Sequence, residues 1–171
     1  RLSQPRTGPA GARNAPQRAR LPLLDRLLDA DPGAPEMPPP SVAEALEKLH
    51  IAVRRDLECL LNARRRRQPL PAQLLELASS IINYGIPDPS SGAYAVPELR
   101  AALVREVEAT IRRHEPRLTR VSVVLAGEDD ELGGALRMKV EAVLRADPVP
   151  EPVSFETLLE PVTRDVTVRE T

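Results

Sequence analysis

The sequence is short of aromatic residues, cysteine and lysine, and each shortage narrows what the chain can be. Only 2% of its 171 residues are aromatic while 42% are hydrophobic, so the core must consist mostly of Leu, Val, Ala and Ile. Cys59 is the single cysteine, which excludes an internal disulfide framework and favours a cytosolic compartment. Its place in a helical pattern predicts a buried structural thiol, not a nucleophile. The basic residues are nearly all arginine, which we interpret as a compositional bias.

Long apolar runs and a strong net charge are also missing. No run approaches the roughly 20 residues that span a bilayer, so membrane insertion is not expected. A net charge of −1 provides no global field to hold nucleic acid. The run Arg64–Arg67 could bind phosphates, but no aromatic residues stand nearby for base stacking. We interpret it as a charged helix end and keep an arginine-rich nucleic-acid-binding module as a weaker alternative.

Composition divides the chain into four parts. Residues 1–20 are rich in Pro, Gly and Arg and predict a disordered basic tail. Residues 21–29, "LPLLDRLLD", predict a short amphipathic docking helix, and residues 30–40 a stiff Pro-rich linker. Residues 41–171 form the single folded domain. The apolar face of the short helix consists of Leu23, Leu24, Leu27 and Leu28. This helix either binds another chain or folds back on its own domain.

The folded part predicts helices first and strands afterwards. Ser41 and Glu44 make a capping-box pattern before a helix that runs to about Ala63. A second helix is expected over 70–85, ending at Gly85, and a third from Pro97 to Glu115. The period then changes from 3.6 to 2. Strands are expected over 120–125, 136–144, 152–160 and 165–170. The fold class is therefore α+β, with three main helices on one face of a small antiparallel sheet.

Catalytic patterns are sparse. His50 and His114 have no Cys or His partner at metal-ligand spacing, and no Gly-rich phosphate loop occurs. We therefore expect no metal, cofactor or catalytic residue. Glu115 is the best candidate for an acid, but Asp88, Asp129 and Asp130 are not paired with it by any spacing. A lysozyme-like hydrolase acting on peptidoglycan remains the alternative.

The helix–strand junction at Glu115, Pro116 and Arg117 is unusual. A carboxylate is disfavoured at a helix C-terminus, where the partial negative charge of the helix dipole collects. Arg117 could neutralise Glu115 internally. We expect instead that the proline separates the two side chains and directs them outward, where a partner chain would meet them.

Four motifs in this order give the chain a family resemblance: "LLDRLLD", "VRRDLECLLNARRR", "SIINYGIPD" and "EPRL" entering a strand. Together they resemble the TssE family of type VI secretion baseplate subunits, relatives of the lysozyme-like baseplate wedge protein of contractile phages. The resemblance covers residues 21 to about 168. It implies a structural, non-enzymatic subunit of a cytoplasmic baseplate docked at the inner membrane.

The resemblance also implies partners. These are the wedge subunits TssF, TssG and TssK, held through Glu115, Pro116 and Arg117, and the subunits of the contractile sheath. The family's sheet is thought to start sheath polymerisation by strand addition, so we expect an edge strand within 150–171 to act as the template.

Overall fold

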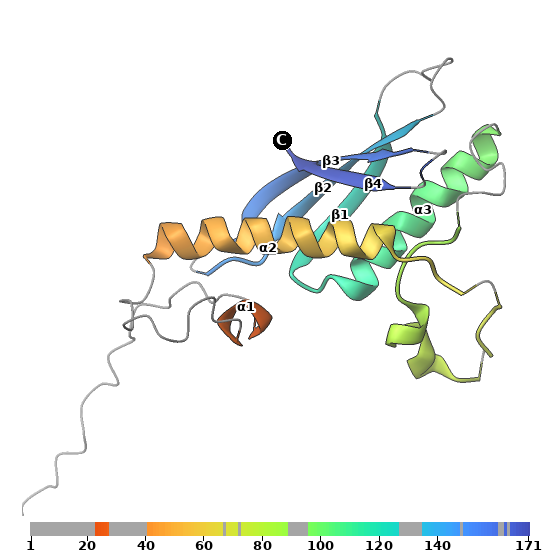
Figure 1. Ribbon diagram of the computed structural model, residues 1–171, viewed down its shortest axis with the longest axis horizontal. Coiled ribbons are helices and arrows are strands. Elements are labelled where there is room, and N and C mark those ends of the chain that lie inside the picture. The colour runs from red at the N-terminus through yellow and green to blue at the C-terminus, as the bar shows by residue number, and fades with distance from the viewer. Residues whose placement is uncertain are drawn as a thin grey trace, which may run out of the picture.

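The computed structural model describes residues 23–27, 41–66, 68–71, 73–88, 96–126, 135–147, 149–160, 163 and 165–171. Three α-helices and a four-stranded antiparallel sheet confirm the α+β class (Figure 1). The helices are α1 (Leu23–Leu27), α2 (Val42–Asn62) and α3 (Pro97–His114), with 3₁₀ turns η1 (Leu75–Ala78) and η2 (Ile81–Asn83) between the last two. The strands are β1 (Leu118–Leu125), β2 (Leu136–Leu144), β3 (Glu151–Leu159) and β4 (Val166–Glu170).

The sheet is a simple meander in the order β1-β2-β3-β4. The predicted alternation of β2 is confirmed, because its five apolar positions from Leu136 to Leu144 are all buried. A bulge interrupts the pairing of β1 with β2 between Thr119 and Ser122. There Arg120 has a φ of 52°, a left-handed conformation that is costly for a residue with a Cβ. The extra residue keeps Val121 and Val123 on the buried face.

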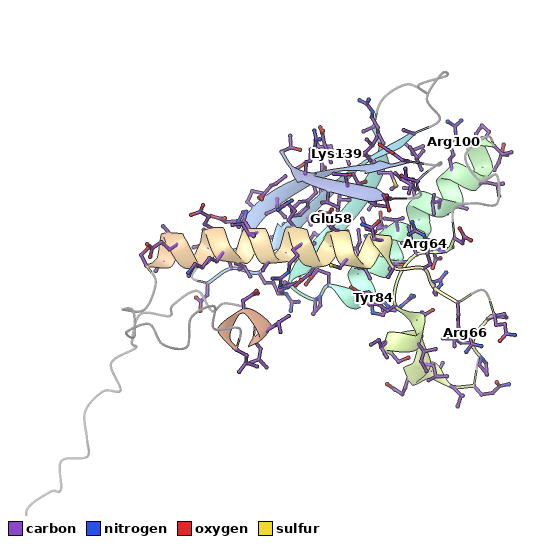
Figure 2. All side chains as sticks on the ribbon, viewed as in Figure 1. Glu58, Arg64, Arg66, Tyr84, Arg100 and Lys139 are labelled. Carbon is purple, nitrogen blue, oxygen red and sulfur yellow. The ribbon has the colours of Figure 1, made fainter. Side chains whose placement is uncertain are left out.

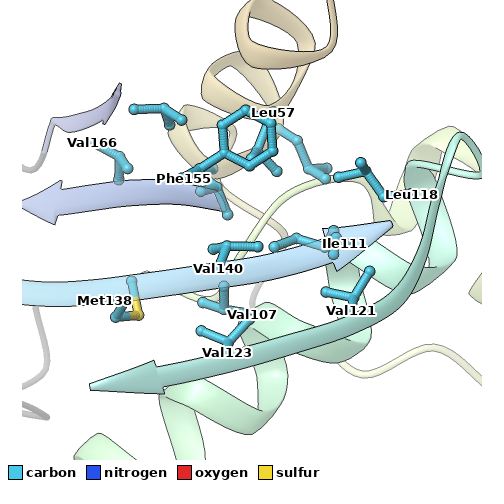
Figure 3. Packing of buried hydrophobic residues seen from close by; sticks show 14 of the residues in the cluster. Leu57, Val107, Ile111, Leu118, Val121, Val123, Met138, Val140, Phe155 and Val166 are labelled. Carbon is cyan, nitrogen blue, oxygen red and sulfur yellow. The ribbon is translucent and has the colours of Figure 1, made fainter. Parts of the chain in front are cut away.

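Helices α2 and α3 cover the buried face of the sheet. Figure 3 shows Leu57 from α2 and Val107 and Ile111 from α3 packing against Val140 and Phe155 of the central strands. The capping box at the start of α2 is confirmed: the Oγ of Ser41 accepts from the Glu44 N–H at 3.2 Å, and the Glu44 carboxylate accepts from the Ser41 N–H at 2.7 Å. Both helices therefore begin where the sequence predicts.

The helix expected over residues 70–85 is wrong in type, because the described part of this segment contains only η1 and η2. Its polar side chains bond to nearby backbone carbonyls and so compete with α-helical hydrogen bonds. Ser80 Oγ donates to Leu77 O at 2.9 Å, and Asn83 Nδ2 donates to Ala78 O at 2.8 Å. The apolar side chains also find no core, since Leu75 and Ile81 are largely exposed.

Gly85 makes a close backbone approach instead of ending a helix. It has a φ of 99°, and a Cβ at this position would lie 2.3 Å from the carbonyl oxygen of Ala63. This approach lets Ile86 donate to Ala63 O at 3.0 Å and accept from the Arg65 N–H at 2.9 Å. Ile86 is fully buried as a result. Gly85 thus fastens the segment with η1 and η2 to the end of α2.

Other expectations from the sequence are wrong or concern residues that the structure does not describe. Cys59 is exposed, so its assignment as a buried thiol is wrong; it lies two positions after the buried Leu57, which is about 200° around the helix. The tail 1–20, the linker 30–40 and Leu28 lie outside the described residues. None of the helices described is long and apolar enough to cross a membrane.

We predict that Gly85→Ala lowers the free energy of unfolding by about 2 kcal/mol or more, since the new Cβ would press on backbone at a strained φ. Urea unfolding of the purified chain measures this. Adding Ala63→Gly should not restore stability, because the nearest atom is the Ala63 carbonyl oxygen and not its side chain. Full rescue by Ala63→Gly would contradict the backbone explanation.

Candidate functional site

The junction of α3 and β1 is a tight turn built on Pro116. Glu115 caps α3, donating its N–H to Ile111 O at 2.9 Å, and its own carbonyl accepts from the Leu118 N–H at 3.1 Å. Pro116 occupies the second position of this four-residue turn, which suits its fixed φ. The turn starts β1 immediately after the helix and brings residues 115 and 117 to the same side.

Glu115 and Arg117 form an internal ion pair. Arg117 Nε donates to Glu115 Oε1 at 2.7 Å, its Nη2 donates to Oε2, and its backbone N–H also reaches Oε1 at 3.2 Å. Glu115 is only 4% exposed. The expectation that Pro116 keeps the two side chains apart and outward is therefore wrong. The hydrogen bonds with Glu115 are the main cause that raises the pKa of Arg117.

The pair belongs to a longer charged network. Arg117 Nη2 also donates to Asp56 Oδ2 at 2.7 Å, and Asp56 Oδ1 accepts from Arg55 Nε at 3.0 Å. Arg55 in turn binds Asp25 of α1, with its Nη1 2.8 Å from Oδ1. The hydrogen bond from Arg55 lowers the pKa of Asp25. One chain of ion pairs thus joins α1, α2 and the corner between α3 and β1.

A pocket of about 440 Å³ opens beside this network. Its apolar walls are Leu23 of α1, Leu60 of α2, Tyr84 and Pro116, and its polar walls come from the network and His114. Tyr84 lies below the C-terminal end of α2 in Figure 2 and meets the His114 ring edge-on at a centroid distance of 5.4 Å. The pocket therefore joins an apolar floor to a charged rim.

The pocket holds two carboxylates, Asp56 and Glu115, but their arrangement does not match glycoside hydrolysis. Catalytic carboxylates must flank the bond that is cleaved, with room for substrate or water between them. Here both carboxylates bind the same Nη2 of Arg117, so a guanidinium occupies the space between them. Asp88 is not part of the pocket lining, while Asp129 and Asp130 lie outside the described residues. Within the described ranges, no cluster of His, Cys, Asp or Glu could hold a metal ion.

Helix α1 folds back on its own domain, and its binding to another chain stays a prediction. It lies against its own domain through Asp25 and Arg55, yet Leu23, Leu24 and Leu27 are 67%, 56% and 72% exposed. Sequence reasoning singled out these leucines but missed Asp25, Arg55 and Asp56. The available signal was weak: Asp56 directly precedes the buried Leu57, so it had to lie beside the core face of α2.

The first edge of the sheet, β1, is partly closed by side chains of α3. Glu108 Oε2 accepts from the Val123 N–H at 3.1 Å, and Arg112 Nη2 donates to Val121 O at 2.6 Å. These two side chains are themselves paired at 2.8 Å. They satisfy backbone groups that a neighbouring strand would otherwise bind. Leu125 is the next residue whose backbone groups point away from β2, and it is 43% exposed.

The opposite edge, β4, is partly closed by α2. The amide of Asn62 binds both backbone groups of Val166, accepting from its N–H and donating to its carbonyl at 2.8 Å each. Val168 is the next residue whose backbone groups point away from β3, and it is only 1% exposed. Glu170 is exposed and ends the strand. The edge strand within 150–171 is thus β4, and at its C-terminal end the Glu170 carboxylate pairs with His50 of α2 at 2.5 Å.

The arginine run after α2 is engaged within the domain. Arg64 Nη1 donates to Leu61 O at 2.8 Å, which satisfies a carbonyl at the helix end, and Arg65 pairs with Glu106 at 2.5 Å. Arg66 donates to Gln68, and Arg67 lies outside the described part of the chain. These contacts fit a charged helix end better than a phosphate-binding patch.

We predict strong coupling between Glu115 and Arg117 in a double-mutant cycle. Arg117→Ala should lower the free energy of unfolding by about 3 kcal/mol, because Glu115 is left buried without its cation. The combined Glu115→Ala and Arg117→Ala chain should be destabilised by less than the sum of the single changes, with a coupling above ~1 kcal/mol. Denaturant unfolding of the four chains tests this, and additive losses would contradict the pairing.

We also predict that His114 makes the fold less stable in acid. Burial lowers the pKa of His114 below its ordinary value of 6.5, so the unfolded chain binds a proton more readily than the folded one. Stability should therefore fall as the pH drops through about 6.5. Urea unfolding at about pH 7.5 and 5.5 should show a smaller loss for His114→Gln than for the unaltered chain. Equal losses would refute the assignment.

Part of the chain is similar in sequence to a known protein family. A family model described as baseplate wedge protein gp25 matches residues 47–149, which is more than half of the chain. The match includes most of α2, all of α3, the Glu115–Arg117 corner and strands β1 and β2. A chain in a solved structure entitled "The baseplate complex from the type VI secretion system" is 18% identical, with a TM-score of 0.45, over 66% of this chain and 94% of that chain. No curated protein matches the sequence.

Proposed function

Because the chain belongs to the baseplate wedge protein gp25 family, we propose that it is the TssE-type subunit of a type VI secretion baseplate. In this proposal it has no enzymatic role. It links the wedge core, formed by TssF, TssG and TssK, to the contractile sheath and initiates sheath polymerisation. Its place is then the cytoplasmic baseplate docked at the inner membrane.

The observation that carries the proposal is the geometry of Arg117. Among the described residues, its side-chain contacts use Nε and Nη2, so Nη1 keeps two hydrogen-bond donors. Glu115 and Asp56 fix the guanidinium in one orientation, and its side chain is still partly exposed. A pre-oriented arginine fork loses little freedom on binding and suits carbonyl or carboxylate groups of a partner. Glu115 and Pro116 then act by positioning Arg117.

Sheath initiation by strand addition is consistent with the sheet edges if it uses their open ends. Leu125 on β1 and Glu170 on β4 are exposed residues, whereas side chains of α3 and α2 bond to the edge backbone at Val121, Val123 and Val166. Added strands gain affinity from backbone hydrogen bonds and specificity from alternating side chains. We therefore propose short pairings at these ends, not along a whole edge.

We predict that Arg117→Lys abolishes copurification with the wedge proteins while the domain stays folded. Lysine keeps the positive charge beside Glu115 but lacks the second arm of the fork, so recovery should fall at least tenfold. Coexpression and pull-down, with thermal unfolding as a check on folding, measure this. Arg113→Lys on the exposed side of α3 is the matched control. Recovery of a folded Arg117→Lys chain at the unaltered level would refute the anchoring role.

The lysozyme-like alternative rests on the two carboxylates that share the pocket. It requires Asp56 and Glu115 to act on a sugar chain although Arg117 lies between them. Incubation with purified peptidoglycan separates the two proposals. We expect no release of soluble fragments; release that is lost in Glu115→Gln would favour the hydrolase.

A further inference from the structure

Helix α1 is held to its domain by charge and not by apolar burial. Its leucines remain more than half exposed, and Asp25 joins α1 to the domain through an ion pair with Arg55. That pair is itself partly exposed, with 41% of the Arg55 side chain accessible. Exposed ion pairs shift an equilibrium by about fivefold or less and are screened by salt. The position of α1 is therefore easily exchanged.

The way α1 lies shows what this surface recognises. Leu23 borders the pocket beside Leu60 and Tyr84. Asp25, two residues later, binds Arg55, which in turn bonds to the pocket residue Asp56. A single short helix thus supplies one apolar side chain and one carboxylate at the same time. Leu23 is itself 67% exposed, so α1 forms one wall of the pocket without filling it, while its carboxylate is bound by Arg55.

We propose that the pocket beside Arg117 is a docking site for a short helix that carries a leucine and, two residues later, a carboxylate. Helix α1 borders this site in the isolated chain and binds Arg55, and a helix of the same chemistry from another baseplate subunit takes its place and fills the pocket on assembly. The identity of that subunit rests on the proposed function, whereas the chemistry of the site does not.

Charge complementarity selects this occupant. Without α1, the network contains Arg55, Arg117, Asp56 and Glu115, and Arg55 keeps only the contact with Asp56. An incoming carboxylate regains the contact that Asp25 gives up, while a basic helix would meet Arg55 unfavourably. Arg117 lines the same pocket, and its side-chain contacts within the described residues use Nε and Nη2, so a partner can bind Nη1 where α1 does not.

The tether explains why replacement needs a partner with extra contacts. Residues 28–40 connect α1 to Ser41 covalently, so the binding of α1 is intramolecular and does not depend on protein concentration. A free helix with only the contacts of α1 competes poorly against this. Weakening the contact between Asp25 and Arg55 should increase the fraction of chains in which the site is open. The apparent affinity for a free helix should rise by the same factor.

The test uses a synthetic peptide with the sequence of residues 21–29 and the full nitrogen-15-labelled chain. Peptide titration should shift the backbone signals of Leu60 and Tyr84 and should bind the Asp25→Asn chain about threefold more tightly than the unaltered chain. Binding should weaken with added salt. A peptide carrying the same Asp25→Asn change should bind about threefold more weakly. Arg55→Gln should weaken binding of the unaltered peptide by a similar factor, while the neighbouring Arg54→Gln should leave it intact.

Three outcomes would overturn the proposal. Equal affinity for the unaltered and Asp25→Asn chains would show that α1 does not compete for the site. Absence of shifts in every chain would show that the surface binds no such helix. Concentration-dependent dimers that the peptide dissolves would assign the site to α1 of a second copy. No baseplate protein takes part in this test, so its failure is distinct from a failure of the Arg117→Lys pull-down.

Discussion

A carboxylate with almost no exposure needs a fixed cation, and the pairing of Glu115 with Arg117 meets that need at the point where α3 becomes β1. The same guanidinium reaches Asp56 and so ties the corner to α2. The three segments that cover or begin the sheet are held at one spot. Helix α3 packs on β1 and α2 on β4, with little direct packing between the two helices, so the ion pairs add a direct link between them. The pocket and the position of α1 both depend on this clamp.

The fold could be predicted where local patterns and tertiary packing agree. The capping box at Ser41, the proline at the start of α3 and the alternation of β2 each state a local preference that the core then reinforces. The helix predicted over the segment with η1 and η2 was wrong for the opposite reason. Its leucines and isoleucines have helical spacing, but no apolar surface receives them, and its Ser and Asn side chains take the backbone carbonyls. Periodicity alone does not reveal whether a surface exists to bury a stripe.

Only the part of the site that is formed by residues adjacent in sequence could be predicted. Glu115, Pro116 and Arg117 stand out because a carboxylate at a helix end is electrostatically unusual. Their true relation, a bidentate pair, depends on the turn geometry, and the third member, Asp56, comes from a helix 59 residues earlier in the chain, as the difference 115 − 56 shows. Such long-range ion pairs leave no spacing signal in one sequence. Asp25 likewise gave no signal of an ion pair, because the leucines around it predict apolar docking.

The two capped sheet edges have a consequence for the subunit before it is assembled. Exposed strand edges are the surfaces through which copies of a β-sheet protein join one another and precipitate. Asn62 on one side, and Glu108 with Arg112 on the other, replace the missing neighbour strands with side chains. The chain can therefore accumulate as separate copies, because its helices protect the described parts of both sheet edges against self-association.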